Sequence, residues 1–463
     1  MREIVRRHWR YFFFFTAVAV ALRLFFIFRY ASISGDSLIY GDIAKNWLRH
    51  GIYGLSAGGG VVPTYIRLPG YPAFLAFIFK VAGMEHYRAA LFLQMLVDTA
   101  SCYLIAMLAW LLAQPRQSDA DAGAERKGEA AALLAFALAA LCPFTASYAA
   151  AALTETWSIF FTALSLLLAS LAVRSQNAAR LWIACGLALG AGIMFRPDNG
   201  MPLAIIGGWL LWRFLRGSQR ALWFRAGIIV ALMVSLFIVP WTIRNWRTMH
   251  RFQPLAPRSA NDPGEFVANG FARWARTWVV DFISVERVLW HVDGEEIDVH
   301  QLAAHAFDSA EQRQQTEQLI ADYNEELSMT PDLDARFSAL ATERIRAHPL
   351  RYYLELPVRR MADMWLRPRT EWFEIETDWW NWDEHSDESA VAVALAVLNL
   401  ALLIAALAGF LRLRASGNTL FWMAVVFIVL RTLFLGTLEN PEPRYTLEMF
   451  PVILSFAGNI VKH

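Results

Sequence analysis

Long apolar runs alternate with shorter polar connections along the whole chain, and this pattern predicts its class. Ten runs are near, or a little below, the ~20 residues that a helix needs to cross a bilayer. They lie at residues 11–31, 89–113, 130–150, 153–173, 180–195, 201–216, 226–243, 389–411, 419–437 and 444–461. The pattern predicts an all-α polytopic membrane protein with about ten transmembrane helices.

Basic residues in the connections predict how the runs are oriented. Lys and Arg accumulate in cytoplasmic loops, and the chain begins with the basic stretch MREIVRRHWR. If this end is cytoplasmic, Arg174, Arg213 and Arg412 fall on the same side of the membrane. We therefore expect an uncleaved first span and two cytoplasmic termini.

Two segments then lie on the non-cytoplasmic side. The first outer loop, 32–88, contains an apolar stretch at 70–83 that is too short to span and predicts an interfacial helix. We divide the chain into an N-terminal transmembrane catalytic module, 1–243, a mainly helical periplasmic segment, 244–388, and C-terminal transmembrane helices, 389–463.

The later part of the outer segment has an apolar stripe at helical spacing. The stripe predicts an amphipathic surface helix; a packed soluble domain is the alternative for this region. Its members are Leu350, Leu354, Val358, Met361 and Trp365, and Arg351, Arg359 and Arg360 lie off it.

Composition excludes several classes of protein. Charged residues make up 18% of the chain, against about 25% in soluble proteins. The net charge of +1 gives no field that would attract nucleic acid. The three cysteines, Cys102, Cys142 and Cys185, fall within predicted spans and are expected to pack as small apolar residues. Neither a phosphate-binding loop nor a zinc-binding spacing is present in the sequence.

Three acids are placed at the outer surface by the predicted topology. Asp36 and Asp42 lie in the first outer loop, where Gly35 and Gly41 predict irregular backbone that turns both carboxylates inward. Glu155 begins the fourth span. Such acids can act as a general base, bind a cation or position a hydroxyl. The alternative is that they are solvated loop residues.

Four arginines run against the expected charge bias. Arg67 lies in the first outer loop, and Arg196, Arg244 and Arg444 fall at the outer ends of predicted spans. Arginine suits phosphate because its planar guanidinium donates paired hydrogen bonds and stays charged. Contact with lipid headgroups is the alternative, but the neighbouring acids favour a phosphate or pyrophosphate ligand.

One opposite-charge pair is expected inside the membrane. Arg23 and Asp98 lie at matching depths in the first two spans. Because an unpaired charge is costly there, the two side chains should form a structural ion pair.

The chain resembles the GT-C glycosyltransferases at these same residues. The first outer loop carries Asp36-Ser-x-x-Tyr40, Ala44-x-Asn46, Tyr53 and Arg67-x-Pro69-Gly70-Tyr71-Pro72, and the later motifs are Thr154-Glu155, Arg196-Pro197, Pro240-Trp241-x-x-Arg244-Asn245, Arg444-Tyr445 and Pro451. The set resembles bacterial members of the protein-mannosyltransferase and aminoarabinose-transferase kind. It occurs in the expected order across most of the predicted membrane part.

The resemblance implies a site and a reaction. Asp36 would sit at the reaction centre, with Glu155 as a second acid and Asp42 as a further candidate. By the resemblance, donor phosphate would be held by Arg196; the charge pattern described above adds Arg67, Arg244 and Arg444 as candidates. Supporting residues are Tyr40, Asn46, Tyr71 and Tyr445.

We therefore expect a membrane glycosyltransferase in the bacterial inner membrane, active at its periplasmic face. It would move a sugar from a polyprenyl-phosphate donor to an acceptor hydroxyl, with inversion. Asp36 is followed by Ser37 rather than by a second acid, so a glycan, a lipid or a protein stays open as the acceptor. A transporter or flippase of lipid-linked sugars and a glycan ligase are the alternatives. The sequence assigns no cofactor; a divalent cation held by Asp36 and Glu155 is left open.

Overall fold

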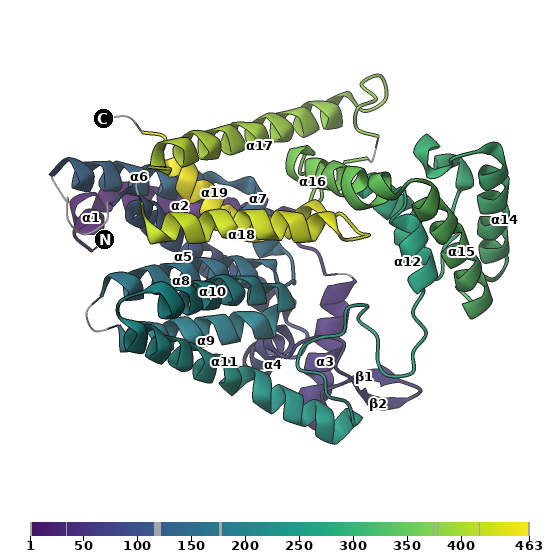
Figure 1. Ribbon diagram of the computed structural model, residues 1–463, viewed down its shortest axis with the longest axis horizontal. Helices are drawn as coiled ribbons and strands as arrows, with labels where there is room; N and C mark the ends of the chain where they lie inside the picture. The colour runs from purple at the N-terminus through teal and green to yellow at the C-terminus, as the bar shows by residue number, and fades with distance from the viewer. Residues whose placement is uncertain are drawn as a thin grey trace. The chain divides into compact units, whose positions relative to one another are not determined.

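The computed structural model describes residues 2–461 except 34, 115–121, 176, 177, 374, 377 and 416. In this described part the chain is almost entirely helical (Figure 1). Its strands, β1 (Gly54–Ala57) and β2 (Gly60–Pro63), form one antiparallel hairpin in the first outer loop. The predicted all-α class is confirmed.

Helices coincide with all ten predicted spans. The apolar helices are α2 (Trp9–Arg29), α5 (Tyr87–Ala113), α6 (Ala122–Leu141), α7 (Pro143–Ala146), α8 (Glu155–Arg174), α9 (Ala179–Phe195), α10 (Gly200–Arg216), α11 (Arg220–Met249), α17 (Ser386–Leu413), α18 (Thr419–Gly436) and α19 (Phe450–Gly458). Six of the described helices are long and apolar enough to cross a membrane, or seven if the pair bent by 50° near Cys142 is one span. The helices α9, α10 and α19, with 17, 17 and 9 residues, are shorter.

The expectation of irregular backbone around Asp36 and Asp42 is wrong. Both acids lie on the regular helix α3 (Asp36–His50). Gly41 lies inside this helix. A Cβ at this position would lie 1.7 Å from the hydroxyl oxygen of Tyr87, which favours glycine here. The glycine marks a close helix approach rather than a loop. The apolar stretch that follows forms α4 (Gly70–Ala82), as the sequence predicts.

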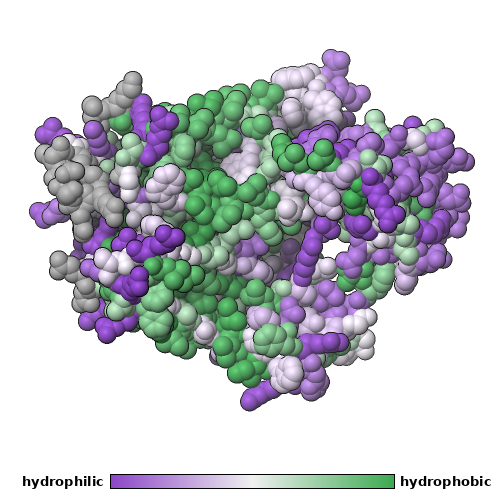
Figure 2. All heavy atoms as spheres, viewed as in Figure 1, coloured by the Kyte–Doolittle hydropathy of each residue, from purple (hydrophilic) through white to green (hydrophobic). Residues whose placement is uncertain are grey.

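The chain divides into two compact units. The first comprises Met1–Pro263, Leu400–Ile428 and Leu447–His463, and the second Gly264–Asn399 and Val429–Thr446. In the first unit α8, α9, α10 and α11 lie side by side (Figure 1). Figure 2 shows extensive apolar surface, in green, over its helices.

The second unit has a hydrophobic core of its own. Trp274, Trp278 and Phe337 are fully buried in it. The core is built by the helices α12 (Asn269–Ala275), α13 (Phe282–Ser284), α14 (Ala310–Glu326) and α15 (Pro331–Ala347), followed by the π-helix η6 (Arg351–Glu355) and α16 (Leu356–Leu366). The mainly helical character expected here is confirmed, and the packed alternative fits better than an isolated surface helix.

The predicted apolar stripe is nevertheless exposed at its start. Leu350 and Leu354 are 78% and 63% exposed, while Arg360 is buried and donates to the carbonyls of Arg276 and Val279. The face carrying Arg360 therefore packs inward, and the apolar face points outward.

An ion pair between α2 and α5 lies within the apolar interior of the first unit. Arg23 Nε donates to Asp98 Oδ2 over 2.7 Å, and both side chains are buried. The expected tie is confirmed. Arg23 also donates to the carbonyls of Ala139 and Ala140. Pro143 has no N–H to donate to the Ala139 carbonyl. Arg23 therefore also supplies the hydrogen bond that this carbonyl would otherwise lack.

Replacing Asp98 with Asn should destabilise the protein markedly. The variant leaves the Arg23 charge buried without its counter-charge, a change that costs about 3–5 kcal/mol. We expect Asp98→Asn to lower the unfolding temperature in detergent. The double variant Arg23→Gln/Asp98→Asn should recover much of the loss because no charge is left. An unfolding temperature equal to that of the unmodified chain in the single variant would contradict the pairing.

Candidate functional site

The start of α3 is fixed by a glycine turn and a backbone bridge. Gly35 has φ +51° and ψ −118°, a conformation open to glycine and strained for other residues. Just before it, Ser32 N donates to the Ala150 carbonyl, and Ser32 pairs with Ala151 as an isolated bridge. The first outer loop therefore begins beside the segment that leads to Glu155.

Asp36 and Arg67 form an ion pair in this loop. Arg67 Nη2 donates to Asp36 Oδ1 over 2.5 Å, and the two side chains are 19% and 34% exposed. The guanidinium lies 5.8 Å from the centre of the Tyr40 ring. Arg67 Nε is buried and has no hydrogen-bond partner among the described residues. The structure thus joins two predicted site residues and leaves Asp36 accessible.

The Pro-Gly-Tyr-Pro turn, which follows Arg67, packs against the end of α9. A Cβ at Gly70 would lie 2.6 Å from the carbonyl of Met194, so only glycine allows the start of α4 to approach the end of α9. Tyr71 then donates to Gln94 over 2.6 Å, and Gln94 donates to the Ala151 carbonyl. The motif is explained by close packing, and Tyr71 has a supporting contact.

Arg196 lies at the end of α9 and contacts three carboxylates. Pro197 disfavours helical backbone in the residue before it, and Arg196 is extended with φ −151° and ψ 128°. Its Nη1 donates to Glu155 over 2.9 Å. Its Nε lies 3.3 Å from Asp198 and 3.1 Å from Glu448. Glu155 and Glu448 are almost wholly buried, so this arginine compensates charge in a poorly solvated place.

Asn199 holds the turn that carries Arg196. Its side-chain oxygen accepts from Ser158 and Thr162 of α8, at 3.0 and 3.1 Å. Its amide donates to the Gly192 carbonyl of α9. The three bonds tie α8, α9 and the turn together, and so fix Arg196 relative to Glu155.

Both ion pairs act electrostatically on Tyr40. Burial raises its pKa to about 12, with a further rise from Asp36 and an opposing effect of Arg67; Glu155 and Arg196 act on it as well. Both the Asp36–Arg67 pair and the Glu155–Arg196 pair are therefore close enough to act electrostatically on this one phenol. Its ring centre is 5.0 Å from that of Tyr71. The phenol stays protonated at neutral pH and can donate a hydrogen bond to an anionic ligand.

Two predicted site residues on α3 instead hold the hairpin. Asp42 accepts from the Ser56 backbone and hydroxyl over 2.7 and 2.8 Å. Asn46 donates to the Gly54 carbonyl and to the Ser56 hydroxyl. These bonds attach β1 to α3, so the structure gives Asp42 and Asn46 a supporting place away from Asp36 on the helix.

Arg244 braces the first outer loop against α11. Its guanidinium donates to the carbonyls of Thr64 and Tyr53, each over 2.6 Å. It also lies 5.3 Å from the Trp241 ring centre. Most of its hydrogen-bonding edge is thus occupied by protein backbone.

Arg444 and Tyr445 belong to the second unit. Arg444 forms an ion pair with Glu442, and the Tyr445 hydroxyl donates to the same carboxylate over 2.7 Å. The Tyr445 carbonyl accepts from Arg431 over 3.1 Å. Within this unit the Arg-Tyr motif is part of a local polar network.

Sequence reasoning missed Asp198, Asn199 and Glu448. Asp198 and Asn199 follow Arg196 and Pro197, and their polarity after an apolar helix was the available signal. Glu448 lies two residues before α19, as Glu155 opens α8. An acid near the start of an apolar helix is a signal that can be read from the sequence. The pairing of Glu448 with Arg196 cannot be read from it.

A metal ion needs several ligand atoms close together. Among the described residues, three ligand atoms within 4.8 Å of one another are found at Asp378, Glu384 and His385, in the second unit. The carboxylates around Arg196 are not in this group, and Arg196 contacts all three of them.

The fold and the site define a polytopic helical membrane protein with paired acids and arginines beside a buried tyrosine. Neither a protein-family model nor a curated protein sequence matches the chain. Two structures of the oligosaccharyltransferase AglB from Archaeoglobus fulgidus match 98% of the chain, at TM-scores of 0.52 and 0.51 and 11% identity. ArnT from Cupriavidus metallidurans matches 96% of the chain and 77% of its own length, at a TM-score of 0.41 and 12% identity.

The likeness to AglB shows that the chain shares the helical membrane fold of this oligosaccharyltransferase. The chain spans 50% of the length of the AglB chain. At this low identity the likeness is one of fold. One of the AglB structures contains an inhibitory peptide and a dolichol-phosphate.

Substituting Gly70 should loosen the site. In Gly70→Ala the new methyl would meet the Met194 carbonyl, and such overpacking costs about 1–3 kcal/mol. We expect a lower unfolding temperature in detergent. Gly208→Ala is the matched control, because its Cβ meets nothing within 4 Å on α10. Equal effects of the two substitutions would contradict the proposed close approach.

Proposed function

We propose that the protein is a membrane glycosyltransferase that moves a sugar from a polyprenyl-phosphate donor to an acceptor hydroxyl. The observation that carries this proposal is the accessible Asp36 carboxylate, held by Arg67 beside Tyr40 and the Glu155–Arg196 cluster. The GT-C fold supports the class of reaction. The dolichol-phosphate in an AglB structure supports a lipid-phosphate ligand.

The reaction needs a base and a stabilised leaving group. The acceptor oxygen attacks the anomeric carbon, its proton passes to Asp36, and the carbon–oxygen bond to phosphate breaks. The products are the glycosylated acceptor and the polyprenyl phosphate, which keeps the bonding electrons. A single displacement inverts the configuration at the anomeric carbon. The charge that develops on phosphate is stabilised by nearby arginines and hydrogen-bond donors.

Exposure separates the roles of the two acids. Asp36 is about one-third exposed, and its Oδ2 has no partner among the described residues. Glu155 is buried against Arg196. We therefore assign Asp36 as the base that contacts the acceptor hydroxyl. Glu155 is assigned as a positioning residue that acts through Arg196.

The donor phosphate is assigned to Arg67 and Arg196, with the Tyr40 hydroxyl as a further donor. The buried Arg67 Nε has no hydrogen-bond partner among the described residues, and an anion would satisfy it. Among the three acids that contact Arg196, Asp198 is the most accessible, with 26% of its side chain exposed. A phosphate can compete with Asp198 for that guanidinium, because each is an anion that accepts paired hydrogen bonds.

The proposed setting is the bacterial inner membrane, with both termini cytoplasmic and the site at the periplasmic face. Charge bias and the outer position of the first loop support this orientation. The acceptor can be a glycan, a lipid or a protein. A divalent cation held by Asp36 and Glu155 is an additional proposal; it would stabilise the leaving phosphate, and Glu448 is a further carboxylate near it.

Asp36→Asn should abolish transfer while preserving donor binding. Asn keeps an oxygen for Arg67 but cannot accept the hydroxyl proton, and loss of a general base costs about 10²–10⁴-fold in rate. Transfer from a polyprenyl-phosphate sugar is measured with purified protein in lipid, alongside equilibrium binding of the donor. Asp42→Asn is the charge-matched control on the same helix, and it should retain most of the activity.

The same assay separates the alternative functions. Turnover unaffected by Asp36→Asn would refute the base assignment. Donor movement between vesicle leaflets without transfer, in the wild type, would establish a transporter or flippase instead. Transfer to a glycan alone among glycan, lipid and peptide acceptors would make the enzyme a glycan ligase.

Arg196→Lys should weaken phosphate binding without unfolding the chain. Lysine keeps the charge that compensates Glu155 and Glu448 but lacks the planar fork. We expect the affinity for a polyprenyl phosphate to fall roughly tenfold, and the unfolding temperature to change little. Arg244→Lys is the comparison, because Arg244 contacts backbone carbonyls. A larger loss of affinity in Arg244→Lys than in Arg196→Lys would transfer the phosphate site to Arg244.

A further inference from the structure

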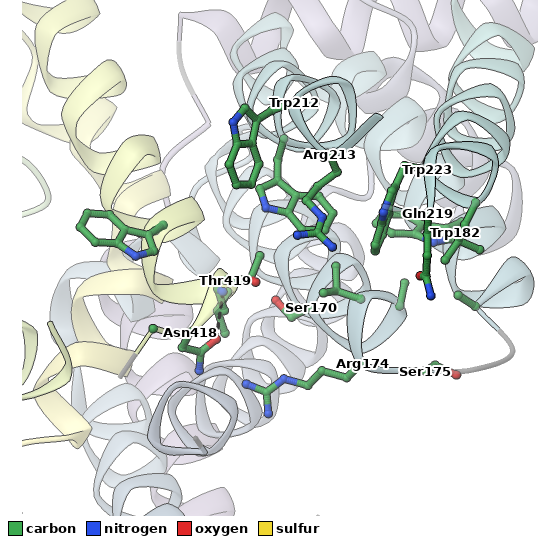
Figure 3. Close-up of a pocket in the computed structure, with 18 residues that line it drawn as sticks. Ser170, Arg174, Ser175, Trp182, Trp212, Arg213, Gln219, Trp223, Asn418 and Thr419 are labelled. Atoms are coloured by element: carbon green, nitrogen blue, oxygen red, sulfur yellow. Dashed lines mark hydrogen bonds between the residues drawn. The ribbon is translucent and has the colours of Figure 1, made fainter. Parts of the chain in front are cut away.

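A cavity separate from the candidate site lies at the far end of α8. Its volume is about 920 Å³. The helix runs from Glu155 to Arg174 over 20 residues, which at 1.5 Å per residue puts the cavity about 30 Å from the candidate site. The lining comes from the ends of α8 and α10, the starts of α9 and α11 and residues 417–422 (Figure 3). All of these segments belong to the first unit.

The described lining of this cavity is basic. Two of its 18 residues, Arg174 and Arg213, are charged, and no acid occurs among them. Arg174 reaches toward Asn418 in Figure 3, and both side chains donate to the Leu111 carbonyl. Arg213 has no such bond in the described part, and its guanidinium points into the cavity. Among the described residues, the positive charge of Arg213 is therefore not compensated by an acid in the cavity lining.

Two buried donors in the wall have no acceptor. The Arg213 guanidinium lies 4.9 Å from the Trp223 ring centre and 5.8 Å from that of Trp209. Arg213 Nε and Trp223 Nε1 are buried, and neither has a hydrogen-bond partner among the described residues. Trp223 itself is only 6% exposed. Buried donors without acceptors are unfavourable, so a bound anion would stabilise this wall.

The rim of the cavity is apolar and exposed. Trp212 and Trp422 are 56% and 55% exposed, and Leu222 is 44% exposed. All three line the cavity, on helices that are apolar along their length. Tryptophan is enriched where a membrane protein meets the headgroup region. The rim therefore suits a ligand that has hydrocarbon chains as well as a charged group.

We propose that this cavity binds an acidic phospholipid. The lipid phosphate would accept hydrogen bonds from Arg213 and from the Trp223 indole N–H. The acyl chains would lie against Trp212, Leu222 and Trp422. Basic pockets between transmembrane helices are known to hold anionic headgroups. The site uses none of the residues assigned to sugar transfer, so it stands or falls independently of that proposal.

The test is lipid retention by the full chain in detergent, measured by native mass spectrometry. The probes are phosphatidylglycerol and phosphatidylcholine with identical acyl chains. Wild type should retain phosphatidylglycerol about tenfold more strongly, and Arg213→Ala should lose this preference. Trp223→Phe keeps the ring and removes the N–H, so its affinity should fall by a smaller factor. Arg216→Ala, on the same helix but outside the lining, should behave as wild type.

Several results would overturn the proposal. Equal retention of the two lipids by wild type would show that charge is not recognised. Unchanged phosphatidylglycerol retention in both Arg213→Ala and Trp223→Phe would place any bound lipid elsewhere. Arg213-dependent binding of inorganic phosphate, without retention of phosphatidylglycerol, would make the ligand a soluble phosphate. If Arg213→Ala fails to fold, as judged by its unfolding temperature, Arg213→Gln and Trp223→Phe provide the same comparison.

Discussion

The structure depends on one constraint: a charge inside the apolar interior must be compensated by the protein itself. Water is absent there, so an uncompensated ion or a freed carbonyl is costly. Arg23 meets this constraint twice, by pairing with Asp98 and by donating to carbonyls at the bend after α6. Arg196 meets it at the site, where one guanidinium contacts Glu155, Asp198 and Glu448. The same rule that stabilises the bundle thus concentrates acids and an arginine at one place.

Charge compensation would not assemble the site without close backbone approach. Gly70 lets the first outer loop contact the end of α9, and Pro197 makes Arg196 extended as that helix ends. Asn199 then fixes the turn to α8. Distant parts of the sequence are thereby brought to one phenol, Tyr40. Residues of the short sequence motifs therefore determine backbone packing as well as supply the charged side chains of the site.

Much of this architecture can be predicted from sequence, because hydropathy is a local property. The apolar runs locate the helices, and matching depths locate the Arg23–Asp98 pair. Predictions failed where a residue type has two uses. Gly41 indicated a loop but lies inside α3, where the side chain of Tyr87 leaves no room for a Cβ. The partners of Arg244 and the approach of Glu448 to Arg196 depend on long-range packing, which no local pattern encodes. Exposure, which distinguishes Asp36 from Glu155, is also a property of the fold.

The two ends of α8 illustrate how one helix separates two chemistries. At Glu155 an arginine is surrounded by carboxylates, so a phosphate must compete with acids that are already in place. Such a site favours a ligand that binds and leaves, as turnover requires. Near Arg174 the described lining of the cavity contains no acid, and Arg213 Nε and Trp223 Nε1 have no acceptor among the described residues. An anion there meets no acid of the described lining, so we expect it to be retained. The difference in compensation, rather than the number of arginines, thus distinguishes the proposed site for turnover from the proposed site for a bound lipid.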